Sequence, residues 1–263
     1  MAQRRRVSVR YGTVRIDVIG DNPASPTTLV MLPSAARDSE DFDDIAERFA
    51  AQGLRVLRPQ PRGMGASVGP MAGLTLHDYA RDVAATIEQY GSGPAFVLGH
   101  AFGQWVARCL AADHPHRVRG VILAAAAART LAPDLREALA IAGDPTQPRQ
   151  ARLSALRKAF FAPGHDPSPW LHNWHPAAAR SQRAAGAATP IEDWWHAGTA
   201  PILDLQAEHD PWRPPETRDD IRVKLGADRV TVVLIDGASH ALIPEQPAAV
   251  VKAVTDWMTA SRP

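Results

Sequence analysis

Three short stretches of the sequence carry residue types that could together perform nucleophilic chemistry. The first, Gly99-His100-Ala101-Phe102-Gly103, follows an apolar run and leads into an amphipathic segment. In the pattern Gly-x-Ser-x-Gly, a tight turn between a strand and a helix presents a serine nucleophile, but here the middle residue is Ala101. The other two stretches follow later apolar runs and supply Asp210 and His240. An acid and then a base, both after the turn, is the order found in one triad-bearing fold.

These residues are positioned by an alternation of strand-like and helix-like segments. Short apolar runs bounded by turn residues predict buried strands, and apolar residues at helical spacing predict helices. The predicted strands are residues 7–9, 14–19, 28–32, 56–57, 95–99, 118–126, 202–206 and 230–235. The predicted helices are residues 39–53, 76–90, 101–113, 217–225 and 248–260. This alternation predicts an α/β fold with a mostly parallel twisted sheet flanked by helices, and with Ala101, Asp210 and His240 at the carboxyl ends of strands.

The alternation is interrupted in the middle of the chain. Residues 129–198 contain no strand-like run, but many alanines, several prolines and four tryptophans. We expect a helical cap of residues 129–198, inserted into a core of residues 1–128 and 199–263. Because the insertion follows a strand, it should cross the carboxyl edge of the sheet, where ligands bind in open α/β folds.

Composition limits the partners that we expect. The net charge of +1 at pH 7 gives no reason to propose a nucleic acid or an anionic membrane as a partner. No apolar stretch is long enough to span a bilayer or to form the core of a signal peptide. The single cysteine, Cys109, predicts a buried structural thiol and no internal disulfide. We therefore expect a cytoplasmic, bacterial protein that acts on a small molecule as a monomer or homodimer.

Five segments resemble the α/β-hydrolase superfamily, in its capped branch of esterases, lactonases and dehalogenase-like enzymes. They occur in the family's order, and the resemblance covers nearly the whole chain outside the insertion. The segments are LVMLPSAARDSEDF (29–42) for the first oxyanion donor, RGMGAS (62–67) for the loop R-G-x-G-x-S, VLGHAFGQWVA (97–107) for the nucleophile turn, PILDLQAEHDPWRP (201–214) for the acid, and GASHALIPEQP (237–247) for the histidine. The resemblance implies a hydrolase fold with a cap.

The resemblance also implies a role for individual residues. His240 takes the position of the base, and Asp210 the position of the acid that orients it. The backbone N–H groups of Phe102 and Ala35 take the positions of the oxyanion hole. Ala101 takes the position of the nucleophile.

The sequence departs from the family at three further places. Pro33 and Ser34 stand where the family usually has His-Gly, and Gln104 stands where a glycine is common. Backbone donors do not need a particular side chain, so the first departure affects the shape of the oxyanion hole more than its presence.

Four interpretations of Ala101 are open, because without a hydroxyl no acyl-enzyme can form there. The serine was replaced by engineering, or the alanine is native and the His240–Asp210 dyad activates water or the substrate. In the third interpretation Ser34 is a relocated nucleophile, although a serine that caps a turn explains it more simply. In the fourth, the protein is a non-catalytic, small-molecule-binding pseudoenzyme. Retention of both acid and base favours an enzyme that acts on a small ester, lactone or amide-like substrate.

Aromatic residues indicate a hydrophobic substrate. Trp105 lies one turn into the helix after Ala101, and Trp212 follows Asp210. Trp194, Trp195 and His196 are consecutive in the insertion and cannot all face the same way on a helix, so at least one of them should line the cleft or the edge of the cap. We expect these four tryptophans, with Ser34, to line the substrate site.

The sequence implies no cofactor and no metal. His172 and His175 are three residues apart, but no carboxylate or cysteine lies near them at ligand spacing. There is no phosphate-binding loop of the type G-x-x-x-x-G-K and no dinucleotide fingerprint. His209, beside Asp210, competes with His240 for the role of base but lies on the wrong loop for the fold.

Overall fold

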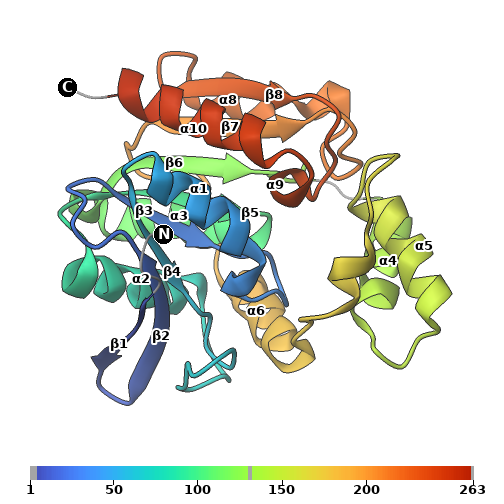
Figure 1. Cartoon of the computed structure of the whole chain (residues 1–263), viewed down its shortest axis with the longest axis horizontal. Coiled ribbons are helices and arrows are strands. Elements are labelled where there is room, and N and C mark those ends of the chain that lie inside the picture. The colour runs from blue at the N-terminus through green and yellow to red at the C-terminus, as the bar shows by residue number, and fades with distance from the viewer. Residues whose placement is uncertain (1–4, 130–131, 262–263) are drawn as a thin grey trace.

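A computed structural model describes residues 5–129 and 132–261 of the chain (Figure 1). Within these residues, eight strands form one sheet in the order β1-β2-β4-β3-β5-β6-β7-β8. β1 and β2 pair antiparallel, as do β2 and β4, and the remaining pairs are parallel. The strands are β1 (Arg5–Tyr11), β2 (Val14–Asp21), β3 (Thr28–Leu32), β4 (Arg55–Pro59), β5 (Ala95–His100), β6 (Val118–Ala124), β7 (Ile202–Ala207) and β8 (Val230–Ile235).

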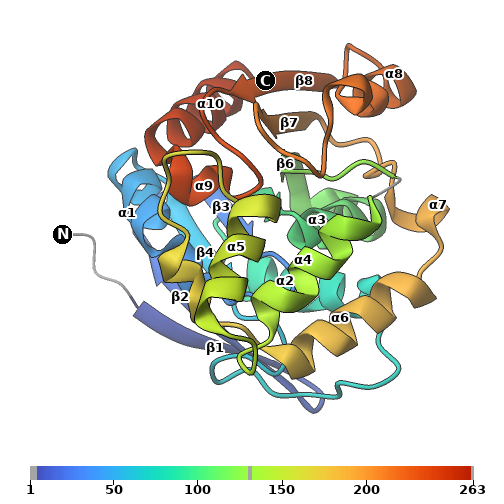
Figure 2. The same ribbon diagram turned by 90° about the vertical axis from the view of Figure 1, so that its right-hand side faces the viewer.

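Helices cover both faces of the sheet. The α-helices are α1 (Asp43–Ala51), α2 (Leu76–Tyr90), α3 (Phe102–Asp113), α4 (Pro133–Gly143), α5 (Arg149–Ala159), α6 (Pro176–Ala188), α7 (Ile191–Trp194), α8 (Asp220–Leu225), α9 (Leu242–Glu245) and α10 (Pro247–Ala260). Short 3₁₀ helices are η1 (Ser39–Phe42), η2 (Pro115–Arg117), η3 (Ser168–Leu171) and η4 (Pro215–Thr217). α1 and α10 pack on one face, and α2, α3 and α8 on the other (Figures 1 and 2).

β3 shows why the central strands are continuous apolar runs in the sequence. All five of its residues are buried. Val30 and Leu32 belong to the hydrophobic core under α2 and α3, whereas Leu29 and Met31 belong to the core under α1 and α10. Because side chains alternate between the two faces and helices cover both, every position of the strand is apolar.

The structure confirms the predicted fold class. Three predicted elements, β3, β8 and α2, have the expected bounds. The helix expected at residues 39–53 is divided into η1 and α1. α1 ends at Ala51, and Gly53, two residues later, adopts φ +82°. The helix expected at 217–225 is shorter, because η4 precedes α8. The short helix α9 after His240 was not expected.

The segment between β6 and β7 is helical where it is described. It contains α4, α5, η3, α6 and α7. α4, α5 and α6 lie beyond the carboxyl ends of the parallel strands (Figures 1 and 2), whereas α7 packs against α3. Residues 130–131 of the expected cap, and residues 1–4 and 262–263 of the expected core, lie outside the described residues. Among the helices that the structure describes, none is long and apolar enough to cross a membrane.

A hydrophobic cluster joins this segment to the loops of the sheet. It contains Leu135, Leu156 and Phe160 from the segment, together with Trp212 and Ala241 from the loops that follow β7 and β8. The inserted helices therefore pack directly against the loops that carry Asp210 and His240.

Candidate active site

The turn between β5 and α3 has the strained geometry of a nucleophile turn, although it presents a methyl group. β5 ends at His100, α3 begins at Phe102, and Ala101 between them adopts φ +47° and ψ −110°. The Ala101 N–H donates to the carbonyl oxygen of Ala124 at 2.9 Å, which ties the turn to the end of β6. Such backbone conformations cost an alanine about 1–3 kcal/mol, so surrounding contacts must hold the turn in place.

Glycines on both sides of Ala101 permit this turn, as the sequence predicts. A Cβ on Gly99 would lie 2.3 Å from the backbone nitrogen of Gln104. A Cβ on Gly103 would lie 2.3 Å from the carbonyl oxygen of Leu32. The helix can therefore approach the ends of β3 and β5 only where no side chain intervenes.

His240 and Asp210 form a buried pair. His240 Nδ1 lies 3.1 Å and 3.0 Å from the two carboxylate oxygens of Asp210. The side chain of His240 is 5% exposed and that of Asp210 is fully buried. Asp210 also accepts a hydrogen bond from the Trp212 N–H at 2.9 Å. Because a carboxylate only accepts, the neutral imidazole carries its proton on Nδ1 and leaves Nε2 with a lone pair.

His100 forms a hydrogen bond to the backbone of His240. Its Nε2 lies 2.7 Å from the carbonyl oxygen of His240, so Nε2–H is the donor. Burial, reinforced by the nearby His240, lowers the pKa of His100 to about 3. His100 is therefore a neutral hydrogen-bond donor that fixes the backbone of the histidine loop.

The expected oxyanion donors lie at the ends of β3 and β5. The N–H of Phe102 is the first of α3 and has no acceptor within the helix. Among the described residues, the N–H of Ala35 has no acceptor either. Next to it, Ala36 adopts φ +62° and donates its N–H to Gln182 Oε1 of α6 at 2.8 Å. A side chain of the inserted segment thus holds the loop that carries one of the two expected donors.

A cavity of about 720 Å³ opens above these residues. Its walls include Ala101, His240, Phe102 and Ala35, so the expected base, oxyanion donors and nucleophile position share one space. We call it the large cavity. Its volume lies in the range of sites for drug-sized ligands.

Only part of the expected aromatic lining is present. Ser34, Trp105 and Trp212 line the large cavity. Trp194 and Trp195 do not, in contrast to the expectation from the sequence. Trp194 is buried behind Trp105, with ring centroids 5.3 Å apart, and Trp195 stacks on Arg108. Trp194 therefore lies one layer behind the wall, and Trp195 packs against a residue of α3 that does not line the cavity.

Other aromatic residues of the inserted segment line the cavity instead. Phe160, Trp170 and Trp174 contribute to its walls, and Phe160 lies 5.6 Å from the His240 ring between centroids. Arg37 lines the cavity as well, with its guanidinium 4.8 Å and 5.0 Å from the rings of Trp170 and Trp174. The sequence shows that these tryptophans are present, but no pattern in it indicates which way their side chains face.

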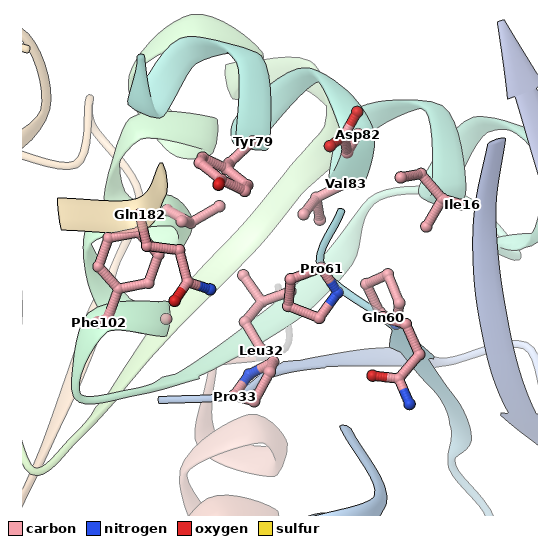
Figure 3. A pocket seen from close by; sticks show the side chains of 13 residues that line it. Ile16, Leu32, Pro33, Gln60, Pro61, Tyr79, Asp82, Val83, Phe102 and Gln182 are labelled. Atoms are coloured by element: carbon pink, nitrogen blue, oxygen red, sulfur yellow. The ribbon is translucent and has the colours of Figure 1, made fainter. Parts of the chain in front are cut away.

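A second, much smaller cavity also borders Phe102 (Figure 3). Its volume is about 30 Å³, and its walls include Pro33, Gly103, Tyr79 and Gln182. This is about the volume of one water molecule in the liquid, so the small cavity cannot hold a substrate. The large cavity is therefore the candidate substrate site.

Among the proteins that are similar in sequence to this chain are a hydrolase and a peroxidase. A 2-(acetamidomethylene)succinate hydrolase of Mesorhizobium japonicum is 24% identical, over 97% of this chain and 95% of its own. A non-heme chloroperoxidase of Streptomyces lividans is 36% identical over 89 residues, which are 34% of this chain. The chain covers only 32% of the chloroperoxidase, about a third of its length.

Solved structures share the fold. A thermophilic esterase from Thermogutta terrifontis superposes with a TM-score of 0.76 at 22% identity, over 99% of this chain and 100% of the esterase. The model of the family described as "Serine aminopeptidase, S33" matches residues 24–247. Since this match covers strands β3 to β8, the turn at Ala101 and the loops of Asp210 and His240, the chain belongs to this family of α/β-hydrolases.

Proposed function

We propose that the protein hydrolyses a small, hydrophobic ester, lactone or amide-like substrate, with a water molecule in place of the serine nucleophile. One observation carries the proposal: the buried His240–Asp210 pair and the methyl group of Ala101 border the same cavity. A base without a hydroxyl beside it can act on a water molecule in the space that the hydroxyl would fill.

The proposed reaction needs no covalent intermediate. Asp210 holds the Nδ1–H of His240, and Nε2 takes a proton from water as the oxygen attacks the substrate carbonyl carbon. The N–H groups of Phe102 and Ala35 donate to the oxyanion that forms. The tetrahedral intermediate then expels the alcohol or amine, which takes the proton back from Nε2, and an acid product remains.

This mechanism is slower than that of a serine hydrolase. Loss of the serine from a catalytic triad costs about a millionfold in turnover. The oxyanion hole and substrate binding alone leave an acceleration of roughly a thousandfold or more over water. We therefore expect an activated substrate, such as an aryl ester or a strained lactone, which compensates for the weaker nucleophile.

The walls of the large cavity and the similar proteins support this substrate class. The lining of the cavity is largely apolar and includes the aromatic side chains of Trp105, Phe160, Trp170, Trp174 and Trp212. Such walls favour an apolar or aromatic ligand. A relative that spans nearly the whole chain is named as a hydrolase, and a solved structure with this fold is named as an esterase. Both names support hydrolysis as the reaction type.

The experiment that tests the proposal compares turnover of aryl esters and lactones by the protein and its His240→Ala variant. We expect His240→Ala to abolish turnover. His209→Ala is the matched control, because His209 is exposed, adjoins Asp210 and is the competing base. Ligand binding without turnover, unchanged by His240→Ala, would instead support a non-catalytic binding protein.

Two further variants separate the possible nucleophiles. Ser34→Ala should leave turnover within a few-fold of the parent if water is the nucleophile, and should abolish it if the Ser34 hydroxyl is. Ala101→Ser tests the turn itself. A burst of product and a gain of several orders of magnitude would show that the surrounding groups can still serve a serine nucleophile.

A further inference from the structure

Three potential metal ligands converge on the side of the sheet that α2 and α3 cover. His77 lies in the first turn of α2, and Cys109 and Asp113 lie one turn apart on α3. His77 Nδ1 is 2.8 Å from Asp113 Oδ2 and 3.4 Å from Cys109 Sγ, which is itself 3.5 Å from Asp113 Oδ2. One nitrogen, one sulfur and one oxygen donor therefore face a common point.

A fourth residue holds the histidine from its other side. Asp193 of α7 lies 3.5 Å from His77 Nε2 through its Oδ2. In proteins, a histidine that binds a metal through one ring nitrogen commonly donates the other ring N–H to a carboxylate. Asp193 is placed for that role, while Nδ1 of His77 faces Cys109 and Asp113.

We propose that His77, Cys109 and Asp113 form a binding site for a divalent zinc-like metal ion, with Asp193 orienting His77. The mixed thiolate, imidazole and carboxylate donor set is one that Zn²⁺ and Co²⁺ accept. With bonds of about 2.0–2.3 Å, neighbouring donors of a tetrahedral site lie about 3.3–3.5 Å apart.

The observed distances come close to this geometry. The two distances that involve Cys109 Sγ, 3.4 Å and 3.5 Å, need almost no change. The 2.8 Å distance between His77 and Asp113 is that of a hydrogen bond and must widen by about half an ångström. Both side chains are partly exposed, at 35% and 27%, so a small rotation suffices.

Because the site borders solvent, an ion can enter it and a water molecule can serve as the fourth ligand. Cys109 is buried and forms the floor of the site, whereas His77, Asp113 and Asp193 border solvent. A water molecule can complete the tetrahedron from the open side.

The position of the site assigns it a structural role. None of the four residues lines the large cavity. They come from α2, α3 and α7, and α7 is the last helix before the chain returns to the sheet in β7. A bound ion would therefore fasten the end of the inserted segment to two helices of the core. This inference is independent of the proposed hydrolysis.

Titration of the metal-free protein with Co²⁺ tests the site. Thiolate bound to Co²⁺ gives a charge-transfer absorption band in the near ultraviolet, and the band should saturate at one ion per chain. Zn²⁺ should displace the band and raise the melting temperature. The band requires Cys109, so Cys109→Ser should abolish it, and His77→Gln should weaken Co²⁺ binding at least tenfold.

Two controls keep the test decisive. His116→Gln removes an exposed histidine of the neighbouring η2 and should change neither the band nor the Zn²⁺-dependent stabilisation. Asp113→Asn keeps the thiol and serves if Cys109→Ser does not fold; it should weaken binding at least tenfold. Absence of a thiolate band at saturating Co²⁺, or a band unchanged by His77→Gln and Asp113→Asn, would overturn the proposal.

Discussion

His100 donates a hydrogen bond from Nε2 to the carbonyl oxygen of His240 over 2.7 Å, although the two residues are 140 positions apart in the chain. His100 is the last residue of β5, directly before the turn at Ala101. His240 lies on the loop after β8. The bond therefore fixes the expected base relative to the expected nucleophile position, and it does so without a charge.

His100 should make the protein sensitive to acid. Its pKa is about 3 in the folded protein, against about 6.5 in an unfolded chain. Between these values the unfolded state binds the extra proton, so stability rises with pH and is lost as the pH falls below about 6.5. At pH 4.5 this group should cost about 2–3 kcal/mol relative to pH 7.5.

His100→Gln isolates this contribution, because glutamine keeps an N–H donor for the carbonyl oxygen of His240 but does not titrate. Urea unfolding at pH 7.5 and pH 4.5 should show a smaller loss of stability in the variant than in the parent. Equal losses would mean that His100 is not held neutral. His116→Gln, at an exposed position, should behave like the parent.

Asp210→Asn should separate orientation of the imidazole from its presence. An asparagine of similar shape can present its N–H₂ to Nδ1 of His240 and so favour the tautomer that lacks a base at Nε2. In a serine protease triad the corresponding change lowers kcat by about 10⁴. We expect a loss on the order of 10³–10⁴ in kcat on aryl esters, with KM changed less than threefold. A loss confined to KM would contradict the proposed role.

Gly103→Ala should destabilise the fold far more than an ordinary glycine substitution. Its Cβ would lie 2.3 Å from the carbonyl oxygen of Leu32, which is backbone and cannot move aside. We expect a loss above about 4 kcal/mol, or no folded protein. Gly20→Ala is the matched control, since its Cβ would meet Leu57 at an ordinary 3.5 Å. Denaturant unfolding followed by circular dichroism measures both.

Gln182→Ala should affect catalysis through the loop that holds Ala35. Gln182 Oε1 accepts the N–H of Ala36 at 2.8 Å, and the loss of this partner leaves a buried donor unsatisfied, at about 1–3 kcal/mol. We expect kcat on aryl esters to fall about tenfold as the oxyanion donor loses its position.

Ser181→Ala supplies the comparison for this effect. Ser181 also links α6 to the core, through a hydrogen bond of 2.7 Å to the carbonyl oxygen of Met71. It should lower stability by a similar amount and leave kcat unchanged. Equal effects of the two variants on kcat would mean that Gln182 acts only through the packing of α6.

Much of the fold could be predicted, because the central strands are buried on both faces and are short apolar runs. β3, which is buried throughout, was expected at its observed bounds for that reason, whereas β8, an edge strand with partly exposed inner positions, was expected from its apolar run alone. The crowding at Gly99 and Gly103 follows from the same local pattern, since only glycine fits where the helix meets the strand ends. Local sequence is sufficient where local sterics decide the structure.

The walls of the site depend on contacts between distant segments, and the sequence alone gave less guidance there. Trp170 and Trp194 both lie on short helices of the inserted segment, yet Trp194 packs behind Trp105 while Trp170 lines the cavity. The hydrogen bond between Gln182 and Ala36 joins residues that are 146 positions apart in the chain. Orientation on short helices of an irregular insertion is decided by tertiary packing, for which no periodic pattern exists.

The large cavity also has a consequence for the heat of binding. Its volume of about 720 Å³ equals that of roughly two dozen water molecules in the liquid. A ligand that fills it removes the faces of Trp105, Trp170, Trp174 and Trp212 from water. Burial of so much apolar surface gives binding a negative heat-capacity change. The binding enthalpy of the true substrate, or of an unreactive analogue, should therefore become steadily more favourable as the temperature rises.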